Sequence, residues 1–85
     1  MGTYLALDMG AESGRLMAVA IESAISTREI YRFATPVTTD ERGRRCWDLP
    51  KIMEEVTTAL KAAAPDGPYL SIAVDTWGLD FGLLD

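Results

Sequence analysis

The sequence has no histidine and only one cysteine, Cys46, among its 85 residues. This scarcity excludes an internal disulfide and the Cys/His clusters that bind structural zinc. A lone cysteine also fits a reducing compartment, so we expect a cytoplasmic protein. Basic residues are few as well: eight Lys and Arg stand against 13 Asp and Glu, a formal net charge of −5. That balance argues against a surface that binds nucleic acid or an anionic membrane.

Long apolar runs are also missing. No stretch approaches the roughly 20 apolar residues that a membrane-spanning helix requires, and the sequence does not begin with a basic and then apolar leader. We therefore expect neither a membrane anchor nor a secretory signal. A chain of 85 residues allows one small domain, which buries roughly 60–65% of its unfolded surface. A large catalytic cleft would need further polypeptide or a partner.

Short apolar segments predict the strands of an α/β fold. Residues 3–7 and 16–21 are short and almost wholly apolar, which is typical of strands covered on both faces. Residues 25–33 alternate in part, as in a strand nearer a sheet edge, and tight connections predict an antiparallel meander. The alternation predicts one face with Ile25, Thr27, Glu29, Tyr31 and Phe33, and the other with Ser26, Arg28, Ile30 and Arg32.

Residues 34–47 lack periodicity and carry proline, glycine and charges, so we predict a loop. This segment contains the only basic cluster, residues 42–45, which we expect to be solvated. A helix should follow, because Asp48 occupies an N-cap position and residues 65–67 end the pattern with turn chemistry. The apolar residues at helical spacing, which predict its packed face, are Leu49, Ile52, Met53, Val56 and Leu60.

A further short apolar run covers residues 70–74. Its branched side chains predict a second buried strand, which delivers Asp75 and the residues after it to a carboxyl end. A helical crossover normally returns the chain parallel to an earlier strand. Residues 81–84 predict one more strand, after which the sequence stops at Asp85 without a cap or a polar tail. We interpret that end as a truncation.

The most informative stretch reads DMGAESGR, residues 8–15, between two apolar segments. A carboxylate at a strand end beside flexible backbone amides and a hydroxyl suits nucleotide phosphates and their magnesium. The P-loop pattern is absent, because Arg15 and Leu16 follow Gly14 where Lys and then Ser or Thr are required. The dinucleotide fingerprint fails too, because its glycines should open a helix. On spacing alone, a structural hairpin with Asp8 as a turn residue is favoured over a phosphate site.

Asp8, Gly10, Ser13 and Arg15 resemble the first phosphate motif of the FGGY family of carbohydrate kinases, within the actin, hexokinase and Hsp70 superfamily. The dipeptide Trp47–Asp48 and the sequence VDTWGLDFGLLD, residues 74–85, resemble the rhamnulokinase branch. The resemblance implies an α/β, ribonuclease-H-like fold: a mixed sheet with antiparallel hairpin strands and one packed helix. Residues 1–85 would then be a partial N-terminal domain of a two-domain sugar kinase, truncated at its C-terminal end.

The same resemblance implies ATP-dependent phosphorylation of a ketose, namely L-rhamnulose at its 1-hydroxyl, with ATP and Mg²⁺ as cofactors. The implied partners are the sugar, ATP and the remainder of the same kinase chain. No catalytic residue is expected within this segment, because the base would lie beyond Asp85, so the segment alone should be inactive. Two alternatives stay open: another FGGY kinase acting on xylulose, fuculose or glycerol, and a non-catalytic fragment or scaffold module.

By this resemblance Asp8 holds Mg²⁺ through water, which agrees with the preference of Mg²⁺ for carboxylate oxygen. Arg15 would supply charge to the phosphates, although it could instead only pair with Asp8. Glu12 adds a negative charge where negative charge should arrive, so we expect its side chain to face outward. The residues implied in phosphate binding are Ala11, Glu12, Ser13, Gly14 and Arg15.

Three residues near the end of the sequence are implied in sugar binding. Gly78 would let the backbone approach the ketose, Trp77 would form an apolar wall, and Asp80 would accept from a hydroxyl. Core packing is the alternative role for Trp77, because a tryptophan after a core strand usually packs.

Overall fold

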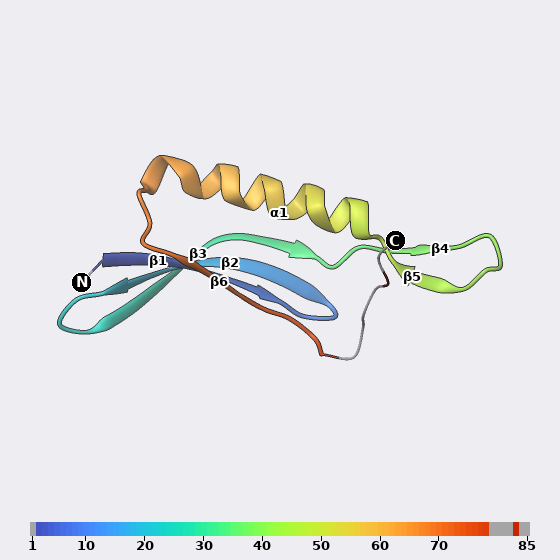
Figure 1. The fold of residues 1–85 in the computed structure, drawn as a ribbon, viewed down its shortest axis with the longest axis horizontal. Coiled ribbons are helices and arrows are strands. Elements are labelled where there is room, and N and C mark those ends of the chain that lie inside the picture. Colours follow the sequence, from blue (N-terminus) through green and yellow to red (C-terminus); the bar gives the residue numbers. More distant parts are fainter. Residues whose placement is uncertain (1, 79–82, 84–85) are drawn as a thin grey trace.

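The computed structural model describes residues 2–78 and 83, which form an α/β unit with one helix on one face of a sheet (Figure 1). The predicted class, a mixed sheet with antiparallel hairpin strands and one packed helix, is confirmed. The sheet has the strand order β3-β2-β1-β6, and a separate hairpin pairs β4 with β5. The elements are β1 (Gly2–Met9), β2 (Ser13–Ile21), β3 (Ile25–Ala34), β4 (Val37–Thr39), β5 (Arg45–Trp47), α1 (Leu49–Ala63), a 3₁₀ turn (Ala64–Asp66) and β6 (Ile72–Asp75).

The connections follow the predicted topology. β1, β2 and β3 form an antiparallel meander, and β6 pairs parallel to β1 after the crossover through α1. The carboxyl ends of β1 and β6 therefore lie at the same edge of the sheet, with Asp8 opposite Asp75. This edge also carries the connection between β1 and β2.

A β-bulge changes which residues of β3 share a face. Tyr31 pairs with Leu16 but Glu29 pairs with Met17, so the register shifts by one residue between them. The predicted continuous alternation is therefore wrong: Glu29 and Tyr31 lie on opposite faces. The extra residue of a bulge reverses the alternation beyond it. The bulge turns Phe33 toward α1, where the side chain is buried, and leaves Arg32 on the other face.

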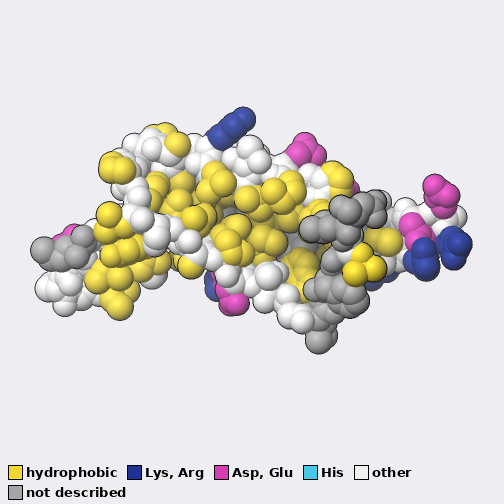
Figure 2. All heavy atoms as spheres, viewed as in Figure 1, with side chains coloured by type: hydrophobic (Ala, Val, Ile, Leu, Met, Phe, Trp, Pro, Cys, Tyr) yellow, Lys and Arg dark blue, Asp and Glu magenta, His cyan; other side chains and the backbone are white. Residues whose placement is uncertain are grey.

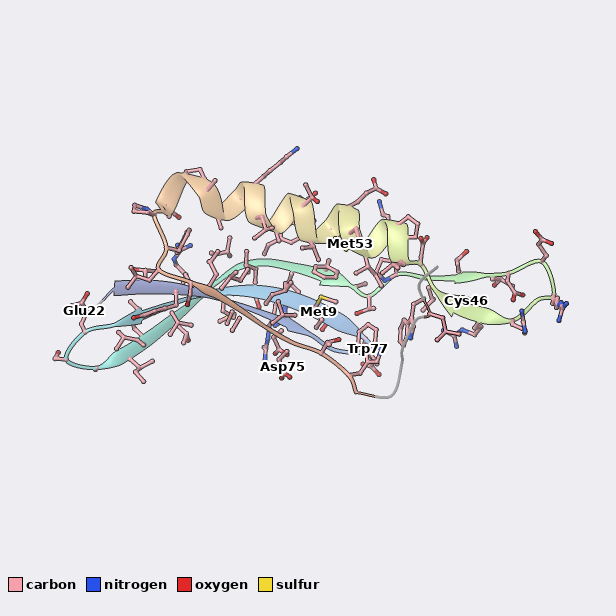
Figure 3. All side chains as sticks on the ribbon, viewed as in Figure 1. Met9, Glu22, Cys46, Met53, Asp75 and Trp77 are labelled. Carbon is pink, nitrogen blue, oxygen red and sulfur yellow. The ribbon has the colours of Figure 1, made fainter. Side chains whose placement is uncertain are left out.

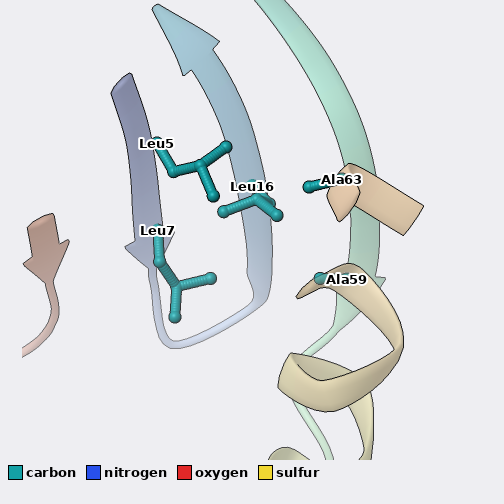
Figure 4. Close-up of a cluster of buried hydrophobic side chains, with 5 residues drawn as sticks. All are labelled: Leu5, Leu7, Leu16, Ala59 and Ala63. Carbon is teal, nitrogen blue, oxygen red and sulfur yellow. The ribbon is translucent and has the colours of Figure 1, made fainter. Parts of the chain in front are cut away.

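The core lies between the sheet and α1, where alternate leucines of β1 and β2 meet two alanines of the helix (Figure 4). Small side chains on α1 allow the helix backbone to approach the sheet closely. The predicted helical face is only partly correct, because Ile52 is buried while Leu49, Met53 and Leu60 remain exposed. The clustered core residues are Leu5, Leu7, Leu16, Ala59 and Ala63.

The helix begins as predicted. The Asp48 side chain accepts a hydrogen bond from the Lys51 N–H at 3.2 Å, which satisfies one of the free donors of the first turn. Lys61 lies in the last turn, where a cation interacts favourably with the helix dipole. Within residues 2–78, no helix is long and apolar enough to cross a membrane.

The strand predicted over residues 70–74 forms as β6, but the expectation that it is buried is wrong. All four of its residues are exposed, and Val74 retains 61% of its accessible surface. Parallel pairing to β1 covers only one edge of β6, and α1 packs over β2 and β3 instead. The strand predicted over residues 81–84 lies outside the described residues, apart from Leu83, which is not in a strand.

The loop predicted over residues 34–47 contains a hairpin, which corrects that prediction. Asp40 organises its turn: Oδ1 accepts from the N–H groups of Arg42 (2.9 Å) and Arg44 (2.8 Å). Gly43 adopts a φ of 79°, a left-handed conformation that glycine tolerates readily. Three-residue strands are too short to show a clear alternation, so the sequence pattern did not reveal them. The basic residues of the turn, Arg42 and Arg44, are exposed as expected.

Candidate functional site

The candidate site lies at the sheet edge where β1 and β6 both end. Asp75 and Trp77 are at this edge, far from the opposite turn marked by Glu22 (Figure 3). Open α/β sheets bind ligands outside the carboxyl ends of their strands. The sequence DTWG, residues 75–78, begins at the end of β6, which is parallel to β1. This agrees with the prediction that Asp75 and the residues after it lie at the carboxyl end of a strand.

The connection between β1 and β2 presents backbone donors. The Gly10 N–H donates to the Ser13 carbonyl at 2.9 Å, which closes a tight turn around Ala11 and Glu12. Thr35 holds the turn from outside, because its N–H donates to the Glu12 carbonyl and its hydroxyl to the Gly10 carbonyl. Ala11 and Glu12 are exposed, and among the described residues no group accepts from their N–H groups. Two amides are therefore available to an anion.

Asp8 and Arg15 form an ion pair across β1 and β2. Nε and Nη2 of Arg15 lie 3.1 Å and 3.0 Å from Oδ2 of Asp8, and each side chain retains 45% of its accessible surface. A half-exposed pair of this kind contributes little to stability, about 0.2–1 kcal/mol. Pairing of Arg15 with Asp8, one of the two roles expected for Arg15, is thus present in the structure.

Gly14 lies on the opposite face from Asp8 and Arg15. It is buried, and a side chain added there would overlap the ring of Phe33 on β3. Gly14 is therefore required for packing beneath α1, whatever its backbone does toward a ligand. Ser13 stands at the loop end of β2, partly exposed, with its hydroxyl 3.5 Å from Nη1 of Arg32.

The register aligns four charged residues across the whole sheet. Arg32 pairs with Arg15, Arg15 with Asp8, and Asp8 with Asp75, so all four lie on the face away from α1. Sequence reasoning missed Arg32, because the predicted alternation grouped it with Ile30, which packs against the core. Only the register of β3 could have revealed its neighbours.

Trp77 contacts a residue from the other sheet. Its ring centroid lies 4.6 Å from that of Trp47, with an interplanar angle of 32°. The pair joins the β4–β5 hairpin to the segment that follows β6. Gly78 is exposed, with open space around the position of a side chain. Asp80, predicted to accept from a sugar hydroxyl, lies outside the described residues.

The residues of this edge fit a magnesium nucleotide. No group of three potential metal ligands occurs among the described residues, so an all-protein metal cage is not present there. Mg²⁺ usually takes only one or two carboxylates and otherwise keeps water and substrate phosphates. Asp8 could hold Mg²⁺ as one such carboxylate, because its side chain is half exposed.

Similar proteins match the chain along its whole length. A rhamnulokinase from Halalkalibacterium halodurans is 38% identical over 86 aligned positions, covering 100% of this chain and 18% of that protein. Rhamnulokinases from Mannheimia succiniciproducens (39% identity) and Klebsiella pneumoniae (38%) cover 94% and 95% of this chain, and 17% of each relative. The chain is a relative of the rhamnulokinases. The predicted resemblance to this branch of the sugar kinases is thus confirmed.

The alignment covers only a small part of each relative. The chain spans less than a fifth of the length of these relatives, 17–18% in each case. No family model matches the chain. The activity of the relatives therefore comes to this chain only as a proposal.

Proposed function

We propose that this chain is the N-terminal part of an ATP-dependent sugar kinase that phosphorylates L-rhamnulose at its 1-hydroxyl. Its sheet would be the beginning of a ribonuclease-H-like domain, the first of two. The observation that carries the proposal is the shared edge of β1 and β6, which joins the phosphate-loop residues to the DTWG segment. Alignment of 94–100% of the chain to proteins named rhamnulokinase supports the choice of substrate.

The loop residues would bind the ATP phosphates. The N–H groups of Ala11 and Glu12, which belong to exposed residues and have no acceptor among the described residues, would donate to these phosphates. Ser13 adds a hydroxyl, and the Glu12 side chain lies at an exposed position, where solvent screens its charge.

Asp8 and Arg15 would exchange partners when the nucleotide binds. In the structure each neutralises the other at about 3 Å. A phosphate oxygen can replace Asp8 as the acceptor for the guanidinium, and Asp8 is then available to hold Mg²⁺ through water. When bound, the ion would neutralise charge on the β and γ phosphates. Each of these charges would then keep an opposite charge as its partner. The Asp8–Arg15 ion pair can therefore break without a large electrostatic cost.

The sugar would lie beside Trp77 and Gly78. The indole offers an apolar face to the carbon–hydrogen side of a sugar ring, and its contact with Trp47 holds that face in place. Gly78 leaves room for a hydroxyl to reach the backbone. Asp80 stays a proposed hydroxyl acceptor. The general base would come from polypeptide outside this segment, which alone should be inactive.

The apolar surface of the chain supports the proposal that the domain is larger. Hydrophobic side chains gather between α1 and β6 (Figure 2). Exposed apolar area on this scale is unusual for a complete soluble domain. The exposed residues on α1 and around β6 are Leu49, Met53, Leu60, Leu70, Ile72 and Val74. A cytoplasmic location stays a prediction that rests on the single cysteine.

Substrate profiling of the complete natural protein tests the proposal. With ATP and Mg²⁺, L-rhamnulose should be phosphorylated with a higher kcat/KM than xylulose, fuculose or glycerol. Preference for one of those three would contradict L-rhamnulose as the substrate, while the proposal of a carbohydrate kinase would stand. Failure to phosphorylate any of the four would contradict the kinase itself and favour a non-catalytic module.

A further inference from the structure

The β-bulge of β3 brings two charged residues together that the sequence places on opposite faces. In an unbroken strand, residues three apart point to opposite sides of the sheet. Beyond the bulge, however, Arg32 shares its face with Glu29 and binds it, with Nε and Nη2 lying 3.0 Å and 2.7 Å from Oε1. The bulge thus positions the Arg32 guanidinium.

That position lies next to the phosphate loop. Nη1 of Arg32 is 3.5 Å from the Ser13 hydroxyl, at the end of the turn that carries the Ala11 and Glu12 amides. Arg32 also pairs directly with Arg15 across β2 and β3. Both guanidinium groups are exposed on the face away from α1.

Two like charges directly opposite each other on neighbouring strands are destabilising. Here each arginine is paired with a carboxylate, Arg15 with Asp8 on β1 and Arg32 with Glu29 on the same strand. Across the sheet the order is Asp75, Asp8, Arg15 and Arg32, so the two positive charges stand side by side on β2 and β3, next to the loop. An anion at this position relieves the repulsion between the two arginines, and the planar guanidinium suits phosphate oxygens.

We infer that Arg32 is a further phosphate-binding residue, which together with Arg15 and the Ser13 hydroxyl clamps a terminal phosphate of the nucleotide. This inference rests on the proposed kinase function and adds a residue to its site. Glu29 is then a positioning residue, because it holds the guanidinium without touching the ligand.

The same strand offers a matched control. Arg28 also lies on β3 and pairs with a carboxylate, Asp66, at 3.1 Å, but on the α1 face of the sheet and away from the loop. Both arginines are exposed, so Arg28→Gln and Arg32→Gln remove the same charge from the same strand. Only the second substitution removes it from the proposed clamp.

The experiment compares the two variants in the complete natural protein, using calorimetric titration with MgATP and AMP and steady-state kinetics. Arg32→Gln should weaken MgATP binding about 10- to 100-fold, the range for a hydrogen bond to a charged group. AMP binding and the KM for the sugar should hardly change. Arg28→Gln should leave all of these constants near those of the wild type. The melting temperatures of the two variants are measured as a control. If they are equal, weaker MgATP binding by Arg32→Gln reflects the lost contact and not a less stable fold.

The outcomes distinguish this inference from the proposed function. If the wild type phosphorylates a sugar but Arg32→Gln binds MgATP as well as Arg28→Gln does, the inference is wrong and the kinase stands. If the wild type transfers no phosphate yet binds MgATP through Arg32, the clamp stands and the kinase proposal fails. A wild type that binds no MgATP overturns both.

Discussion

The ring of Phe33 on β3 lies against Gly14, its cross-strand partner on β2. A Cβ atom at Gly14 would come within 2.9 Å of both Cε1 and Cε2 of that ring. Real side chains do not approach so closely, and the ring is buried on the α1 face of the sheet, with 5% of its surface exposed. Gly14, the glycine that follows Ser13, is therefore constrained by packing.

Gly14→Ala should lower the free energy of unfolding by about 1–3 kcal/mol, the usual range for overpacking a core. Chemical denaturation measures the change. Gly78→Ala is the control. Open space surrounds that position, so the free energy of unfolding of this variant should be unchanged. Adding Phe33→Leu should recover part of the loss, because a smaller side chain makes room for the methyl group. An unaltered unfolding midpoint in Gly14→Ala would contradict this packing.

Asp8→Asn should reduce kcat by on the order of 100-fold in the complete kinase, because the amide cannot replace the carboxylate toward Mg²⁺. Stability should change by no more than about 1 kcal/mol, because the pair with Arg15 is half exposed. Asp66→Asn breaks a similarly exposed pair with Arg28, far from the loop, and should leave turnover intact. Equal turnover in the two variants would show that Asp8 is only structural.

The β4–β5 hairpin should loosen in acid. The Arg44 backbone N–H, with further contacts from Arg44 and Arg42, holds the pKa of Asp40 below its usual range. A depressed pKa stabilises the folded hairpin above the unfolded value of about 3.9, and this stabilisation is lost as the pH falls through the folded value. Amide chemical shifts of the turn, followed by NMR below pH 5, should report the change.

Asp40→Asn is the matched variant for that titration. An asparagine retains the carbonyl oxygen that accepts from the two N–H groups but cannot be protonated in this range. Its turn should therefore show no transition in acid. A transition in both proteins would point to another titrating group.

Trp77→Ala should raise the KM for the sugar about 2- to 10-fold, in line with the energy of an aromatic contact. The KM for ATP should stay the same, because the phosphate loop lies on other strands. Trp77→Phe keeps an aromatic face and should recover most of the affinity. A KM for the sugar that does not respond to either substitution would leave Trp77 with only its packing role against Trp47.

Local chemistry explains the predictions from sequence that succeeded. The helix over Leu49–Ala63 begins at its aspartate cap, two meander strands follow from short apolar runs, and the third follows from its partial alternation. The parallel direction of β6 also follows, since a helical crossover restricts direction, whereas its pairing with β1 was not predicted. The cap and the apolar runs depend on residues close together in the chain. The hairpin in residues 34–47 was missed because strands of three residues leave too little pattern.

Residue patterns along the chain predicted the four strands of the main sheet, the helix and their order, and sequence identity relates the chain to the rhamnulokinases. Only the tertiary structure decided which charges meet. The single extra residue in β3 reverses the alternation and moves Arg32 beside Arg15, and the parallel register sets Asp75 opposite Asp8. The structure also decided that β6 is exposed, because its burial depends on which neighbours cover it. Local patterns specify a strand, but register and coverage depend on residues far apart in the chain.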